Sequence, residues 1–117
     1  MQRLRLTGIR TEGRHGAREG ERDAAQPFLV DLEVDVEARE DDLATTADYR
    51  ELVELVRAVV ARESFSVIET LAQRIAESVA GRPGVLACRA IVHKPLAADR
   101  LDAADVAAEA VAQAVEE

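Results

Sequence analysis

"FLVDLEVDVE", residues 28–37, alternates between apolar and mostly acidic side chains. Because successive side chains of a β-strand point to opposite faces, this period of two predicts a long strand with one buried face. The other face is exposed to solvent or contacts a partner. A strand this long and one-sided is typical of an antiparallel sheet that is covered by helices or by another subunit. The buried face consists of Phe28, Val30, Leu32, Val34 and Val36.

Three weaker strand patterns flank this stretch. Residues 3–9 alternate apolar and basic side chains, and the glycine-rich segment 11–27 that follows is predicted to be a loop. Residues 85–92 form a third strand, which Pro95 ends because proline cannot donate to a ladder. The alanine-rich tail is predicted to hold a strand at 105–111 and then to fray or turn helical. The expected buried face of the third strand is Leu86, Cys88, Ala90 and Val92.

The sequence between residues 48 and 81 changes to a helical period. Asp48 and Glu51 form a start signal close to a capping box, and the apolar stripe that follows ends near Arg62. Ser66 and Glu69 form a second capping box before a clean amphipathic stripe, which Gly81 closes. The predicted order is therefore β-β-α-α-β-β, an α+β fold in one domain over residues 1–117.

Composition narrows the class of protein. The chain has 117 residues, 48% of them hydrophobic but only 3% aromatic, so its small core of aliphatic side chains makes oligomerisation plausible. A net charge of −8 argues against binding nucleic acid or an anionic membrane. No apolar run approaches a membrane span, and the first residues lack a signal-peptide core. A single cysteine excludes a disulfide framework, so we expect a cytoplasmic protein.

One basic residue stands apart from the others. Lys94, in "AIVHKPLA" (90–97), is the only lysine beside 14 arginines. Arginine is permanently charged, whereas a lysine amine can act as a base or proton relay. Lys94 is thus either a compositional accident at the end of a strand or a residue kept for proton transfer. Tyr49, the only tyrosine, and the two histidines, His15 and His93, complete the short set of residues suited to such transfer.

The carboxylates and metal ligands are less distinctive. Glu69 is expected to cap its own helix, but a carboxylate there can also hold the donor edge of an amidine-like heterocycle with two hydrogen bonds. Glu21 resembles an ordinary solvated charge of the loop. His and Cys have no metal-ligand spacing, so we expect no metal and no cofactor.

Taken together, the ordered segments resemble the bacterial dihydroneopterin aldolases of folate biosynthesis. The resemblance covers nearly the whole chain and is weakest after residue 98. It implies the tunnelling fold, a four-stranded antiparallel sheet with two helices on one face. It also implies a homo-oligomer, with subunits joined edge to edge into a tetrameric ring and two rings stacked into an octamer. The matching segments are "LTGIRTEGRHGAREGER", "QPFLVDLEVDV", "DDLATTADYREL", "SVIETLAQRIA" and "AIVHKP".

The family reaction implied is retro-aldol cleavage of dihydroneopterin to hydroxymethyl-dihydropterin and glycolaldehyde, without metal or Schiff base and often with epimerisation of the side chain. By resemblance Lys94 is the general acid and base. Tyr49, from the adjacent subunit, protonates the carbanion. Glu69 anchors the amino group and ring N–H of the pterin, Ile68 adds backbone contacts, and Glu21 lies near the substrate side chain.

The chain also departs from the family pattern. Gly20 stands where an aromatic residue is frequent, "KPLAA" lacks a second proline, and the last strand is rich in alanine. Two other functions therefore stay open. One is an epimerase acting on dihydroneopterin or its triphosphate, for which Arg14, Arg18 and Arg22 offer positive charge. The other is a non-catalytic, ring-forming module that binds pterins.

Overall fold

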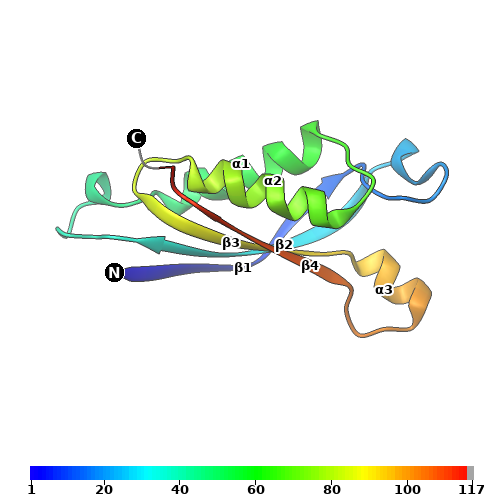
Figure 1. The fold of residues 1–117 in the computed structure, drawn as a ribbon. Coiled ribbons are helices and arrows are strands. Elements are labelled where there is room, and N and C mark those ends of the chain that lie inside the picture. Colours follow the sequence, from blue (N-terminus) through cyan, green and yellow to red (C-terminus); the bar gives the residue numbers. More distant parts are fainter. Residues whose placement is uncertain (116–117) are drawn as a thin grey trace.

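The computed structural model describes residues 1–115 as one four-stranded antiparallel sheet with helices on one face (Figure 1). The strands lie side by side in chain order, β1-β2-β3-β4, so β1 and β4 are the two edges. Helices α1 (Tyr49–Arg62) and α2 (Ile68–Ala80) pack against the same face, which confirms the predicted α+β architecture. The strands are β1 (Gln2–Gly13), β2 (Gln26–Val36), β3 (Val85–His93) and β4 (Ala107–Gln113).

The alternation in β2 produces the core as predicted. Its five apolar side chains are at most 2% exposed and face the helices. They pack against Leu52 and Val56 of α1 and against Leu71 and Ile75 of α2, which are equally buried. Burying an aliphatic or aromatic side chain of this size contributes about 1.5–3 kcal/mol, so this layer is the main source of stability. The acidic face of β2 lies on the side of the sheet without these two helices.

Helix α1 (Tyr49–Arg62) begins where the sequence predicts. The Asp48 carboxylate accepts a hydrogen bond from the Arg50 amide at 3.0 Å. Glu51 does not complete a capping box, because its carboxylate lies 3.5 Å from the Arg82 guanidinium. The start signal is thus correct in position and wrong in its second half.

Helix α2 (Ile68–Ala80) begins one residue later than predicted, and the capping box of Ser66 and Glu69 is absent. Extended Val67 is the N-cap, with no side-chain cap bond. Tertiary contacts explain this, because the Phe65 amide donates to His15 Nδ1 at 3.0 Å and holds the chain extended just before the helix. At the other end Gly81 is the C-cap itself, with φ −78°, rather than a left-handed residue beyond it.

Strand β1 is longer than the predicted 3–9, and the loop is shorter. Gly8, with φ +70°, shifts the register between Leu6 and Ile9, and this bulge lets the strand continue to Gly13. The remaining loop, 14–25, contains a short 3-10 turn, Glu21–Asp23. Periodicity failed here because the bulge interrupts the alternation without ending the strand.

The predicted face of β3 is wrong at one residue. Leu86 is 42% exposed, while its neighbour Val85 is buried. The register explains the exchange, because Asp35 pairs with Ala87 and Val36 pairs with Val85, which leaves Leu86 as an extra residue. Such a bulge turns one side chain to the opposite face.

The segment after β3 contains a third helix that the sequence did not predict, α3 (Pro95–Leu101). Pro95 occupies its first turn, where a missing N–H costs nothing. The predicted strand 105–111 is present as β4, two residues further on, and no helix follows it as far as Val115. Within residues 1–115, no helix is both long and apolar enough to cross a membrane.

Candidate active site

A pocket of about 580 Å³ lies between the 14–25 loop, the start of α2 and the segment that joins β3 to α3 and β4. Four of the five predicted site residues line it: Glu21, Ile68, Glu69 and Lys94. These residues are far apart in sequence, so the fold brings them together. A second hollow of about 610 Å³, beside Phe28 and Arg57, contains none of the predicted residues.

Lys94 and Glu21 form an ion pair in this pocket. Lys94 Nζ lies 2.8 Å from Glu21 Oε2, and the two side chains are 12% and 3% exposed. The backbone of Lys94 is fixed between strands, because its amide donates to the Val106 carbonyl at 2.8 Å. Removing one partner of such a sheltered pair would leave a poorly solvated charge, so the two groups depend on each other.

Hydrogen bonds hold the Glu21 carboxylate in its ionised form. Burial alone would raise its pKa, but hydrogen bonds from Lys94, from Gln26 and from the Arg18 amide lower the pKa to about 2. The Gln26 side chain is itself buried and also donates to the His15 carbonyl at 3.0 Å. The carboxylate is therefore fixed from three directions.

Gly16 provides the space that Glu21 occupies. A Cβ atom at this position would collide with the Glu21 carboxyl group. The Gly16 amide also donates to the Phe65 carbonyl at 2.9 Å, which ties the loop to the connection between α1 and α2. The loop backbone thus passes directly behind the acid.

We expect acid to destabilise the protein through Glu21. Its pKa is about 2 in the folded chain against an ordinary value of 4.5. A lowered pKa stabilises the fold above the ordinary value, and this contribution, on the order of 3 kcal/mol, disappears as the pH falls through that window. Unfolding midpoints measured between about pH 5 and pH 2 should fall more for the natural chain than for Glu21→Gln. Equal slopes for the two would contradict this role.

Ile68 and Glu69 open helix α2 and line the pocket. Ile68 is buried and its side chain joins the core, whereas Glu69 is exposed in the first turn. The N-cap is Val67 rather than Ser66, so Glu69 is the second residue of the helix instead of the third and the predicted capping box is not formed. An acidic group is stabilised at a helix N-terminus by the aligned backbone amides.

Tyr49 lies outside this pocket. It is the first residue of α1. The segment just before it packs against Gly84, next to the start of β3, because a Cβ atom added to Gly84 would lie 2.9 Å from the Thr46 carbonyl carbon. Lys94 follows the other end of that strand, which has nine residues. At about 3.3 Å per residue these ends are about 30 Å apart. The exposed Tyr49 ring cannot reach Lys94 within one chain.

The two histidines have contacts that explain them without catalysis. His15 is fully buried, and its ring bonds the Val60 carbonyl at 2.9 Å and the Phe65 amide. His93 lies between Asp31 at 2.7 Å and Asp105 at 3.0 Å. Burial lowers the pKa of His93, but these two carboxylates outweigh that effect and raise it. Among residues 1–115 no three His, Cys, Asp or Glu side chains cluster as a metal site.

Sequence reasoning missed three residues that border the site. The sequence predicts Gln26 in the loop, although its place directly before the alternating strand is a usable signal. For Arg18 the sequence indicates only a positive charge. For Arg100 it gives no signal, yet the guanidinium lies 3.8 Å from Glu21 Oε2 because α3 turns it toward the pocket. Because the sequence pattern does not predict α3, it gives no reason to place side chains of that helix near the pocket.

Comparison with known proteins identifies the family. The dihydroneopterin aldolase family model matches residues 4–111. A dihydroneopterin aldolase from Streptomyces coelicolor is 40% identical over 99 residues, or 81% of this chain and 83% of the relative.

Two solved structures have the same fold. The E. coli dihydroneopterin aldolase in complex with neopterin superposes with a TM-score of 0.85 over 96% of this chain and 99% of that one, at 24% identity. A dihydroneopterin aldolase from a Burkholderia species, bound to guanine, gives 0.77 over 96% and 90%, at 26% identity. From the family match over most of its length, this chain belongs to the dihydroneopterin aldolase family.

Proposed function

We propose that this chain cleaves dihydroneopterin to hydroxymethyl-dihydropterin and glycolaldehyde in folate biosynthesis, the retro-aldol reaction of its family. One observation supports the proposal most directly: Lys94 and Glu21 form their 2.8 Å ion pair in the pocket that Glu69 lines. The pocket therefore combines a group that can exchange a proton with an acceptor that can anchor a ring. A cytoplasmic location stays a prediction from the sequence.

Glu69 is suited to hold the pterin ring. A carboxylate only accepts hydrogen bonds, and the amino group and ring N–H of a pterin present two adjacent donors. Guanine has the same donor edge and is the ligand of the Burkholderia relative. Ile68, directly before Glu69, would add backbone contacts to the ring. The pterin ring would then lie against the start of α2, and the side chain of the substrate would point toward Lys94.

The chemistry requires two proton transfers. The hydroxyl on the second side-chain carbon loses its proton, the bond between the first and second carbons breaks, and the second carbon leaves as the aldehyde of glycolaldehyde. The electron pair moves into the protonated pterin ring, so no metal is required. A proton then adds to the first carbon and gives the hydroxymethyl product. We assign the hydroxyl proton to Lys94, whose neutral amine form accepts it and becomes the ammonium beside Glu21, and the last proton to Tyr49.

This assignment requires a second copy of the chain. Tyr49 is exposed at the opposite end of β3 from Lys94, so the phenol must come from a neighbour. Both β1 and β4 are edge strands, and edge-to-edge pairing would bring copies together in a ring. We propose a tetrameric ring, two of which stack into an octamer, with one site at each junction between neighbours.

Incubation of the purified protein with dihydroneopterin, without added metal, tests the reaction. We expect chromatography to show hydroxymethyl-dihydropterin and an equal amount of glycolaldehyde. Formation of the side-chain epimer alone would replace the aldolase with the epimerase. Pterin binding without any product would indicate the non-catalytic module instead.

A further inference from the structure

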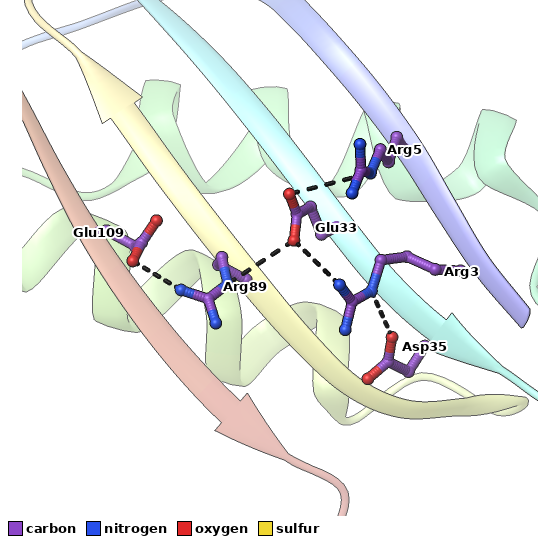
Figure 2. Close-up of polar contacts among 6 residues, drawn as sticks. All are labelled: Arg3, Arg5, Glu33, Asp35, Arg89 and Glu109. Carbon is purple, nitrogen blue, oxygen red and sulfur yellow. Dashed lines mark hydrogen bonds and ion pairs between the residues drawn. The ribbon is translucent and has the colours of Figure 1, made fainter. Parts of the chain in front are cut away.

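The face of the sheet without α1 and α2 has a row of charged side chains that crosses all four strands (Figure 2). We name this row the charge belt. Its sign alternates by strand: positive on β1, negative on β2, positive on β3 and negative on β4. Its members are Arg3, Arg5, Glu33, Asp35, Arg89 and Glu109.

Charged groups in the middle of the charge belt have more ion-pair partners within the chain than those at its ends. Glu33 lies within 4 Å of three arginines, whereas Glu109 contacts Arg89 alone among the belt residues. Arg5 has only a 3.9 Å contact to Glu33, and its side chain is 68% exposed. Arg3 already contacts Asp35 at 2.8 Å and Glu33 at 3.5 Å, but its side chain is 46% exposed and its guanidinium has further N–H donors. Arg3 and Arg5 on the β1 edge and Glu109 on the β4 edge can therefore each take a further partner.

The two edges are complementary in charge. The β1 edge has arginines and the β4 edge has a glutamate, so β4 of one copy beside β1 of the next would continue the alternation. Pairing β1 with β1 would instead place arginines side by side, and opposed like charges are destabilising. We propose that Glu109 pairs with Arg3 of the next copy across a β4–β1 junction, with Arg5 as its diagonal neighbour. The register of this junction rests on the proposed function, in which neighbouring copies share one site.

Within one chain, Glu109 and Arg3 are not at the same level. Glu109 pairs with Ile91, which pairs with Asp31, and the Asp31 carboxylate accepts the Gly8 amide at 2.7 Å. Glu109 is thus level with Gly8. Arg3 is level with Gln113 instead, through Asp35 and Ala87. Four residues along β4 separate these two levels, or about 13 Å.

The shared site requires a stagger between copies in one direction. Tyr49 lies at the end of the sheet where β1 and β3 begin, and Lys94 lies at the other end. A neighbour that brings Tyr49 toward Lys94 must slide toward the Lys94 end, which carries its Arg3 from the level of Gln113 toward Glu109.

A stagger of four residues agrees with the geometry of a closed barrel. A closed barrel with strands tilted by about 36° shifts by one residue per strand, as eight strands with a shear of eight do. A copy with four strands then shifts by four residues, the spacing from Gln113 to Glu109. The same register places Val111 opposite Met1, two large side chains that are 49% and 74% exposed.

Cysteine pairs test the register without involving the charges. Opposed residues of antiparallel strands have Cα atoms about 4.5–5.5 Å apart, which a disulfide spans. Arg3→Cys combined with Glu109→Cys should give covalent multimers on mild oxidation. The matched pair Arg3→Cys with Gln113→Cys, level within one chain, should not. Cys88 is buried and does not compete. Equal cross-linking of both pairs, or multimers only from the control, would overturn the proposed register.

Charge reversal tests the ion pair itself. Glu109→Arg should raise the concentration at which the assembly dissociates by about tenfold or more, since like charges then meet at each junction. Adding Arg3→Glu in the same chain should restore assembly, because each junction regains opposite charges. Glu54→Arg, on the exposed face of α1, is the control. If assembly is unchanged in Glu109→Arg, the pairing is wrong. These tests use no substrate, so a chain that assembles as proposed without turnover would contradict only the proposed reaction.

Discussion

Lys94→Ala should lower the rate of dihydroneopterin cleavage by about a hundredfold to ten-thousandfold, the usual contribution of one positioned acid or base. Pterin binding should be almost unchanged, because the proposed anchor is Glu69, a separate residue of the pocket lining. Single-turnover product formation measures the first effect and a fluorescence titration with neopterin measures the second. Loss of binding in step with loss of rate would contradict the assignment.

Lys94→Arg separates proton transfer from charge. A guanidinium can keep an ion pair with Glu21, so the carboxylate keeps its partner and the fold its stability. Because arginine does not give up its proton, we expect this variant to be nearly as slow as Lys94→Ala. A fast arginine variant would mean that the site needs only a positive charge, and the single lysine would be a compositional accident.

Mixing two inactive variants tests whether neighbours share the site. Lys94→Ala and Tyr49→Phe each disable one half of the proposed site. Subunits exchanged between the two should form some junctions with both residues intact, so the mixture should recover activity that neither parent has. If subunits exchange and no activity returns, Tyr49 and Lys94 do not act in one shared site.

Glu69→Gln should weaken pterin binding by about tenfold to a hundredfold, the effect of losing a hydrogen bond to a charged group. The amide keeps the shape of the side chain but places an N–H donor against a donor-rich edge, so one of two bonds is lost and its partner is left unsatisfied. Calorimetric titration with neopterin or guanine measures the change in Kd.

Glu77→Gln is the matched control for Glu69→Gln. It makes the same change on the same helix, away from the pocket of Lys94. The control should bind as the natural chain does. If Glu69→Gln also binds normally and merely lowers the melting temperature, the carboxylate serves the helix rather than the ligand.

The strength of the local pattern decided which parts of the fold were predictable. The strict alternation of β2 identified the central strand and its buried face, since one slip would expose the whole set. The same reasoning was wrong at two β-bulges. Gly8 let β1 continue beyond its predicted end, and an extra residue at Leu86 reversed one side chain. A bulge is a property of the pair of strands, so a single strand's sequence does not reveal it.

The site was predictable only in part, for a related reason. Lys94 stood out by its rarity, and the pocket joins it with Glu21, Ile68 and Glu69. The capping motif of α2 predicted a local role for Glu69 that the fold does not use, because His15 holds the preceding residues extended. Tertiary contacts overrode a local preference, as they commonly do at helix ends.

Gly16 should also be a sensitive position in a mutational screen. It has no side chain, yet a single added methyl group would occupy the place of the Glu21 carboxyl and displace the partner of Lys94. A random screen for inactive but folded variants should therefore recover replacements at Gly16 alongside those at the charged pair. The set of positions that cannot be changed is therefore larger than the set of residues proposed to touch the substrate, because Gly16 leaves the room that the Glu21 carboxyl fills.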